Sequence, residues 1–303
     1  MVQTQPTVRT KPGDRLAANT QSTTIHAGPR RKTWEKLFWY ALLILISLVT
    51  IFPFLWIFLT AFKGPTDAVY STPPQLIPRD PTIDNFIRVW NQLPVGNFFL
   101  NSVVVAVSTT GLNVLITALA AYPFAKMNFP GRDTIFYLLL VTLIVPVQLT
   151  YIPSFILAIK VFHYHDTLRA LILPNLASVF SIFLLRQAFK TIPNDLIDAA
   201  KIDGANELRI WWNVLLPVIR PSLAAVAIFT FVTSWNDFFW PSLMLPTMEN
   251  KTLPVGLVAL QGMFSSDFRG TAAGVTMTVI PIMLFFIALQ RQFIRGLTGA
   301  VKG

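Results

Sequence analysis

The sequence has no cysteine among its 303 residues, and charged side chains are scarce. Without cysteine there is no disulfide framework, no thiolate nucleophile and no cysteine-ligated metal. Charged residues make up only 13% of the chain, whereas an average soluble domain carries about 25%. Hydrophobic residues make up 53%, and the mean hydropathy is +0.57. This composition predicts a membrane protein rather than a soluble enzyme.

Sequence patterns for catalysis and metal binding are also missing. None of the 14 glycines is followed by lysine, which excludes the Gly-Lys-Ser/Thr sequence of a phosphate-binding loop. No catalytic triad or paired-carboxylate site stands out. His163, His165 and Asp166 lack a fourth ligand, so we interpret them as part of an ordinary connector rather than a metal site. We expect no enzyme activity, no metal and no cofactor bound by this chain.

Six apolar runs are long enough to cross a bilayer, which needs about 20 predominantly apolar residues. The fold class is therefore predicted to be all-α, a polytopic membrane protein with residues 34–303 as one six-span domain. Arg169 and Arg186 lie near the ends of the fourth run, where long basic side chains can reach the headgroups. The predicted spans lie near residues 37–62, 98–122, 134–157, 168–189, 222–245 and 271–290.

Basic residues set the orientation of these spans. The net charge of +10 could indicate nucleic-acid binding, but basic residues also collect on the cytoplasmic side of membrane proteins. The tail, the 125–133 loop, the 186–221 loop and the segment after Gln290 hold 17 Lys and Arg, against seven on the other side. Both termini are predicted to be cytoplasmic, and polar residues 1–33 are predicted to be a disordered tail. We expect membrane lipid, not nucleic acid, around the chain.

The charged segment 190–221 between the fourth and fifth runs is predicted to form two short helices with a sharp corner. The first passes Asp198 and ends at Asp203-Gly204, because glycine accepts a left-handed C-terminal turn cheaply. The second presents one apolar face, made of Leu208, Trp211, Trp212, Leu215 and Leu216. That face can rest on the bundle at headgroup level, leaving the first helix in the cytosol. The first helix is then either a docking element for a partner or an ordinary solvated loop.

This segment, "DAAKIDGANELRIWWNVLLPVIRP", resembles the EAA loop of inner-membrane permease subunits of ABC importers. That loop carries Glu-Ala-Ala, a glycine four residues later and a closing Leu-Pro. Here aspartate replaces the glutamate, which keeps the charge but shortens its reach. The resemblance implies a type I importer permease whose first loop helix docks on a separate ATPase. The ATPase-coupling residues implied are Asp198, Ala199, Ala200, Asp203, Gly204, Ala205, Leu216 and Pro217.

The resemblance extends over roughly residues 34–303. The segments "VPVQLTYIPSF", "TSWNDFFWPSLML" and "LTGAVKG" are similar to the carbohydrate-uptake branch, which contains the smaller six-span subunit of the maltose transporter. It implies a bacterial or archaeal inner-membrane complex that imports a sugar. The complex would contain a second permease subunit in a heterodimer, two ATPase subunits that use ATP and Mg, and an extracytoplasmic solute-binding protein. The cargo could instead be a glycerophosphodiester, a polyamine or a peptide.

Polar residues inside the apolar runs are candidates for the translocation path. An acid within a span usually faces the bundle interior or water, and Asp237 is the one plausible intramembrane charge. The candidate path residues are Gln148, Thr150, Asn175, Trp235, Asn236 and Asp237. The alternative is that they form an aromatic belt and helix–helix hydrogen bonds. An ion-driven carrier is a less favoured function, because no internal repeat is visible.

Two external segments remain. Residues 82–90, "TIDNFIRVW", predict a short helix that lies on the membrane surface or contacts a partner. The connection 246–270 is longer than the about 2–8 residues that join neighbouring helices in bundles. The resemblance implies that it faces the solute-binding protein, whereas the alternative is a passive connector. The residues expected to face that protein are Gly262, Met263, Phe264, Ser265, Ser266 and Asp267.

Overall fold

The computed structural model describes residues 33–72, 75–263 and 268–301. These residues form helices and one isolated β-bridge, between Lys63 and Pro81. They divide into two units, one ending at Phe52 and one beginning at Pro53, and each is described by itself. The predicted tail lies outside the described residues, except for Thr33, the first residue of α1.

Among the described residues, three helices are long and apolar enough to cross a membrane singly. They are Trp34–Ala61 within α1, Val95–Lys126, which is α3, and Phe268–Ile287 within α15. The full bounds are α1 Thr33–Ala61, α2 Asp84–Gln92, α3 Val95–Lys126, α4 Arg132–Val141, η1 Thr142–Ile144, η2 Val147–Thr150, α5 Tyr151–Lys160, α6 Arg169–Ile172, η3 Leu173–Asn175, α7 Val179–Lys190, α8 Asn194–Ile202, α9 Glu207–Ile210, η4 Trp211–Leu215, α10 Leu216–Val218, α11 Arg220–Asn236, α12 Phe239–Met244, η5 Met248–Asn250, α13 Leu253–Gly256, α14 Ala259–Met263 and α15 Phe268–Val301.

Three further spans exist only if bent helix pairs are counted as one each. The pairs Arg132–Ile144 with Val147–Lys160, Arg169–Asn175 with Val179–Lys190, and Glu207–Val218 with Arg220–Asn236 bend by 94°, 42° and 82°. Pro146 lies at the first break, in an extended conformation. Proline removes a helical hydrogen bond and pushes the preceding residue out of the helical region, so a break at this position is expected. The predicted third span, 134–157, is therefore not one straight helix.

The predicted fifth span, 222–245, is also interrupted. α11 ends at Asn236, and Asp237 follows in an extended conformation before α12 begins at Phe239. The backbone N–H groups of Phe239 and Trp240 donate hydrogen bonds to the Asp237 carboxylate. An acceptor at this position satisfies N–H groups that the start of a helix leaves without a partner. The acid thus starts a second helix where apolar continuity suggested a single one.

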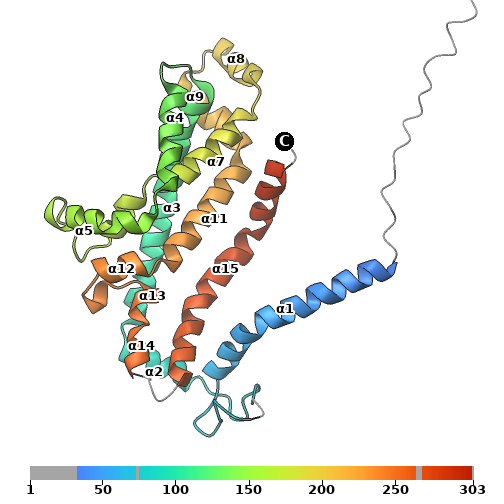
Figure 1. Cartoon of the computed structure of the whole chain (residues 1–303), viewed down its shortest axis with the longest axis vertical. Helices are drawn as coiled ribbons and strands as arrows, with labels where there is room; N and C mark the ends of the chain where they lie inside the picture. The colour runs from blue at the N-terminus through green and yellow to red at the C-terminus, as the bar shows by residue number, and fades with distance from the viewer. Residues whose placement is uncertain (1–32, 73–74, 264–267, 302–303) are drawn as a thin grey trace, which may run out of the picture. The chain divides into compact units, whose positions relative to one another are not determined.

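α3 is the central helix of the second unit. It lies against α7 and α11, and α11 in turn lies against α15 (Figure 1). α8 and α9 lie at one end of this bundle, whereas α2 and α14 lie at the other. A buried polar stripe runs along α3 among its apolar neighbours. The stripe consists of Ser102, Thr109, Asn113 and Thr117.

α2 is the short helix predicted from residues 82–90. Its inner face holds Asn85 and Val89, both buried, and its outer face exposes Ile83, Ile87 and Trp90. The Asn85 Nδ2 donates to the carbonyl oxygens of Ala61 and Lys63 at 2.8 and 2.9 Å. The carbonyls at the C-terminal end of α1 need such donors, because they have no partner within the helix. Asn85 therefore fixes α2 at this end of the bundle.

The expectation that the Arg186 side chain reaches the headgroups is wrong. Its side chain is only 8% exposed and lies between α3, α4 and α7. The guanidinium donates to the Phe124 carbonyl and to the Asp133 carboxylate, both at 3.0 Å, and lies 3.8 Å from the Phe136 ring centroid. A buried cation is tolerated when it is paired and hydrogen-bonded in this way. Arg186 joins three helices near the end of the bundle that carries α8.

Candidate functional site

The first candidate site is the segment from α8 to α10. α8 ends at Ile202, and Gly204 has a φ of +78°, as the predicted corner requires. The Ala205 N–H donates to the Ala200 carbonyl and the Gly204 N–H to the Lys201 carbonyl, both at 3.0 Å. This pair of bonds is the Schellman arrangement, which satisfies the last carbonyls of a helix. The sharp corner predicted at Gly204 is confirmed.

The predicted apolar face of the second helix is wrong in part. Ile210, Trp211 and Leu215 are buried, whereas Leu208 and Trp212 are 65% and 59% exposed. Residues Trp211–Leu215 form a π-helical turn, which has i→i+5 hydrogen bonds. The wider turn places Ile210 and Leu215 on the same side and rotates Trp212 outward. The Trp211 Nε1 donates to the Ala118 carbonyl at 3.3 Å and so attaches this turn to α3.

α8 holds to the bundle by one face only. Ile197 is buried, whereas Leu196 and Ile202 are 44% and 87% exposed. Asp198 is also exposed, and it has no hydrogen-bond or ion-pair partner among the residues that the structure describes. Of the predicted coupling residues, Asp198, Ala199, Asp203 and Gly204 are exposed, and Ala200, Ala205, Leu216 and Pro217 are half-buried. α8 thus presents apolar and acidic side chains together on a free surface.

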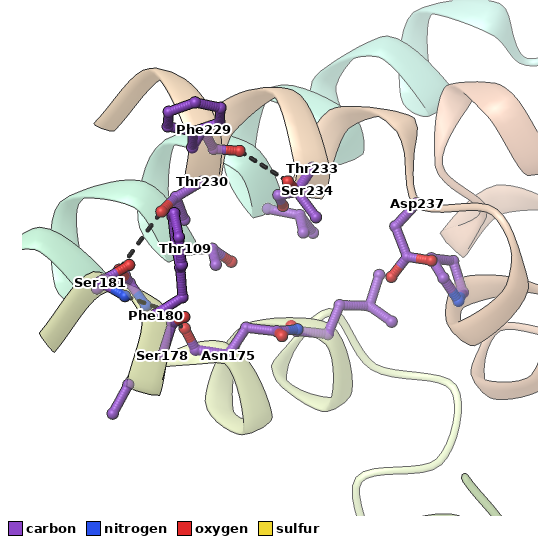
Figure 2. A pocket seen from close by; sticks show the side chains of 15 residues that line it. Thr109, Asn175, Ser178, Phe180, Ser181, Phe229, Thr230, Thr233, Ser234 and Asp237 are labelled. Atoms are coloured by element: carbon purple, nitrogen blue, oxygen red, sulfur yellow. Dashed lines mark hydrogen bonds between the residues drawn. The ribbon is translucent and has the colours of Figure 1, made fainter. Parts of the chain in front are cut away.

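The second candidate site is a cavity of about 310 Å³ between α3, the α6–α7 region and the α11–α12 region. Figure 2 shows hydroxyl, amide and carboxylate side chains around it, with Asp237 on one side. The lining residues are Val105, Thr109, Asn113, Leu171, Asn175, Ala177, Ser178, Phe180, Ser181, Phe229, Thr230, Thr233, Ser234, Asp237 and Pro241. Polar groups therefore converge from three separate elements of the bundle.

Hydrogen bonds join these elements to one another around the cavity. The Asn113 Nδ2 donates to the Asn175 carbonyl at 3.0 Å, and the Thr230 hydroxyl donates to the Asn113 Oδ1 at 3.4 Å. The Thr109 hydroxyl is buried and has no hydrogen-bond partner among the described residues. A buried hydroxyl without a partner is costly, and water or a bound solute in the cavity can satisfy it. Asn113 is the centre of this network because it contacts both neighbouring helices.

The structure brings two of the six predicted path residues to this cavity, Asn175 and Asp237. Trp235 is only 2% exposed and stacks on Phe231, away from the cavity. The Asn236 amide donates to the carbonyl of Val232 on its own helix. Gln148 and Thr150 are exposed in η2 and do not line the cavity.

Sequence reasoning missed the hydroxyl residues on α11. Thr230, Thr233, Ser234 and Asp237 are spaced i, i+3, i+4 and i+7, which places them on one face of a helix. This spacing was visible in the sequence as a polar stripe within an apolar run.

The predicted binding-protein-facing loop is described only in part. Gly262 lies in α14, and Met263 is the last residue of that helix. Phe264, Ser265, Ser266 and Asp267 lie outside the described residues. The start of the 246–270 connection is attached to the segment between α5 and α6, since the Asn250 Nδ2 donates to the Asp166 carbonyl at 3.0 Å.

Comparison with protein families identifies the family of this chain. The family described as "Binding-protein-dependent transport system inner membrane component" matches residues 113–299, which include the whole α8–α10 segment and all the cavity residues from Asn113 onward. The chain belongs to this family. It is the membrane-spanning permease subunit of an ABC importer, crosses the inner membrane several times and is not itself the ATPase.

Curated relatives cover nearly the whole permease. The chain is 35% identical over 279 residues to the arabinooligosaccharides transport system permease protein AraQ of Halalkalibacterium halodurans, covering 90% of this chain and 100% of that protein. It is 31% identical over 279 residues to the sn-glycerol-3-phosphate transport system permease protein UgpE of Shigella flexneri, covering 89% of this chain and 99% of the relative.

A solved structure has the same fold. It is the crystal structure of a bacterial ABC transporter involved in the import of the acidic polysaccharide alginate. The TM-score is 0.74 at 21% identity, over 88% of this chain and 100% of the other. This likeness extends the family assignment to the helical arrangement but says nothing about the solute.

Proposed function

We propose that this permease lines the path of a neutral carbohydrate and is driven by a separate ATPase that docks on α8. The working complex contains a second permease subunit, two ATPase subunits that use ATP and Mg, and a solute-binding protein outside the membrane. Both termini lie in the cytoplasm in this proposal, as the distribution of Lys and Arg predicts.

The composition of the cavity carries the choice of cargo. Among the residues that line it, there are three threonines, three serines and two asparagines, which can donate to and accept from sugar hydroxyls. The rings of Phe180 and Phe229 lie edge to face, with centroids 6.1 Å apart, and offer apolar surface for the C–H face of a sugar. The volume of about 310 Å³ lies at the lower end of the range for small-molecule sites, about 300–1,000 Å³.

The charges of the lining residues argue against ionic cargo. No Lys, Arg or His lines the cavity, so an anionic group such as a phosphate would find no charged donor there. The one acid, Asp237, lies beside the backbone N–H groups of Phe239 and Trp240 at the start of α12, which offset part of its charge. A glycerol phosphate would meet this carboxylate without a compensating cation. A polyamine would find only one partially satisfied carboxylate. A neutral, hydroxyl-rich solute fits best.

The docking of an ATPase is supported by the surface of α8. The side chains of Ile202 and Leu196 are exposed although they are apolar, and a monomer in water would bury them. Asp198 adds a charge that has no partner among the described residues. Apolar anchors beside a charge are typical of a helix that fits into a partner's groove. The side chains of Asp198 and Ala199 correspond to the acidic and small positions of the EAA loop.

The proposed cargo can be tested with the complete transporter in proteoliposomes. Stimulation of ATP hydrolysis by the solute-binding protein would be measured with neutral oligosaccharides and with sn-glycerol-3-phosphate. Thr233→Val removes a cavity hydroxyl and should raise the sugar concentration for half-maximal transport about three- to tenfold, the usual effect of one hydrogen bond. Thr150→Val is the matched control, because Thr150 also donates to its own helix but lies outside the cavity. Stimulation by glycerol phosphate alone would refute the proposal.

A further inference from the structure

The last turn of α3 carries two polar side chains that face α8 and α9. Tyr122 and Lys126 are four residues apart and therefore lie on the same side of the helix. Tyr122 is buried, and its ring lies edge to face with Phe189 at 6.0 Å between centroids. Both residues belong to the central helix, which also carries Thr109 and Asn113 of the cavity.

Tyr122 reaches the C-terminal end of α8 through one carboxylate. Its hydroxyl donates to the Oε2 of Glu207, the first residue of α9. The other carboxylate oxygen, Oε1, pairs with the Lys201 Nζ in the last turn of α8 at 3.0 Å. Glu207 thus holds α3 with one oxygen and α8 with the other. An aspartate would be too short for both contacts.

Lys126 reaches the N-terminal end of α8. Its Nζ donates to the Ile192 carbonyl at 2.5 Å and to the Oδ1 of Asn194, the first residue of α8, at 2.9 Å. A lysine has three donors, so it can serve both acceptors at once. The two ends of α8 are therefore held by side chains one helical turn apart on α3.

We propose that Tyr122 and Lys126 form a two-point clamp through which a displacement of α8 moves α3 as one body. Two attachments prevent the rotation that a single attachment would allow. The ion pair between Lys201 and Glu207 contributes little to stability, because the two side chains are 52% and 44% exposed and exposed ion pairs are weak. The role of the clamp is to set the direction in which α3 moves when α8 is displaced. From Tyr122 to Asn113 is about 14 Å along the helix at 1.5 Å per residue, so the motion is delivered directly to the cavity wall.

This inference rests on the proposed docking of the ATPase on α8, and the two can be tested separately. The chain has no cysteine, so single cysteines introduce labels at chosen positions only. Ile202→Cys on α8 should react with a maleimide in the permease alone and be protected in the complex with the ATPase. Reaction that is equally fast in both would refute the docking proposal, whatever the clamp does.

The clamp itself is tested with two spin labels, at Asp195→Cys on α8 and Val107→Cys on α3. Asp195 is exposed and is not among the residues proposed to contact the ATPase. Val107 is 57% exposed, so a label fits there. The distance between the labels is measured in the complete complex, free of nucleotide and trapped with ATP and vanadate. With the clamp intact the distance distribution should be the same in both states. In Tyr122→Phe with Lys126→Met, which keeps the ring in the core, the two distributions should separate.

Energetic coupling gives an independent readout. Tyr122→Phe and Glu207→Gln should each lower the stimulation of ATP hydrolysis by the solute-binding protein by about fivefold or more, the usual lower bound for coupled sites. The double variant should be no worse than either single one, because both changes break the same connection. Lys201→Glu combined with Glu207→Lys should recover part of the loss, since it restores the pair between α8 and α9.

A matched control changes two residues that lie outside the clamp. Tyr137→Phe with Lys160→Met changes the same residue types at positions outside the clamp, and it should alter neither the distance nor the stimulation. If a clamp variant fails to assemble, Lys201→Met tests the same connection from an exposed side chain. A change of distance in the intact protein as large as in the variant would overturn the clamp. Additive effects of Tyr122→Phe and Glu207→Gln would also overturn it.

Discussion

Replacing Gly204 tests whether the corner after α8 depends on backbone conformation alone. Gly204 has a φ of +78°, and a Cβ added there would have no heavy atom within 4 Å. A new side chain therefore meets no neighbour, and the whole penalty comes from the left-handed backbone. This separates the position from Gly256, where an added Cβ would lie 2.4 Å from the ring of Phe98.

The expected magnitude follows from that conformation. A residue with a Cβ in the left-handed region costs about 1–2 kcal/mol, and asparagine costs least. Such a free-energy change alters an equilibrium by a factor of about 5–30. We expect the corner amides to open more often by about this factor. The increase should be smallest in Gly204→Asn, larger in Gly204→Ala and largest in Gly204→Val. Valine should be worst, because its branched side chain is also restricted at χ1.

The assay is amide hydrogen exchange of residues 203–205 in the purified permease, followed by stimulation of ATP hydrolysis in the complex. The N–H groups of Gly204 and Ala205 close the end of α8, so their exchange reports the corner directly. Gly111→Ala is the matched control, since Gly111 lies inside α3, has no positive φ and also leaves an added Cβ without a neighbour. Alanine should be neutral or slightly favourable there.

Equal exchange in the asparagine and valine variants would refute the reasoning, because the two differ in backbone strain and in χ1 freedom but not in contacts of the added Cβ. A loss of stimulation with normal exchange would also refute it. In that case the side chain itself, and not the corner, would be disturbing the docked ATPase.

Two further predictions concern the end of the bundle that carries α2 and α14. Gly256→Ala should lower the melting temperature of the purified permease, because the fully buried ring of Phe98 cannot move aside and overpacking costs about 1–3 kcal/mol; an unchanged melting temperature would contradict it. Burial would raise the pKa of Asp67, but the N–H groups of Arg79, Asp80 and Gly64 and the Gln75 amide lower it below its usual value. The carboxylate therefore stabilises the 64–80 loop above about pH 4 and stops doing so only as the pH falls through its lowered pKa. Asp67→Asn should speed amide exchange of Arg79 and Asp80 about tenfold at neutral pH, and no change would show that charge is unimportant there.

Local chemistry explains which features the sequence alone could determine. The apolar runs are visible because a span must bury about 20 residues in lipid, whatever lies beside it. The end of α8 at Gly204 was predictable because the left-handed turn is a property of the glycine and its own helix. The likeness of residues 198–217 to the EAA loop likewise depends on residues close together in the chain.

Tertiary structure decided which side of each helix faces inward. In a membrane protein, lipid-facing and core-facing side chains are both apolar, so hydrophobic spacing does not distinguish them. The spacing placed Leu208 and Trp212 on the buried face with Trp211 and Leu215, but in the structure Ile210 is buried beside Trp211 and Leu215, and Leu208 and Trp212 are exposed. The place of Arg186 near the end of an apolar run predicted a surface cation, but its guanidinium is bound by Asp133 and the Phe124 carbonyl.

The formation of the cavity also depended on tertiary structure. Thr109 and Asn113, Asn175, and the α11 stripe that ends at Asp237 lie on separate segments, and only the helix arrangement brings them together. The interruption of the fifth span at Asp237 is local by contrast, because its carboxylate lies beside the backbone N–H groups of residues two and three positions along the chain. Sequence determined where the chain is apolar and where it turns, since these depend on neighbouring residues. Tertiary structure determined what the polar residues enclose, since that depends on helices far apart in the chain.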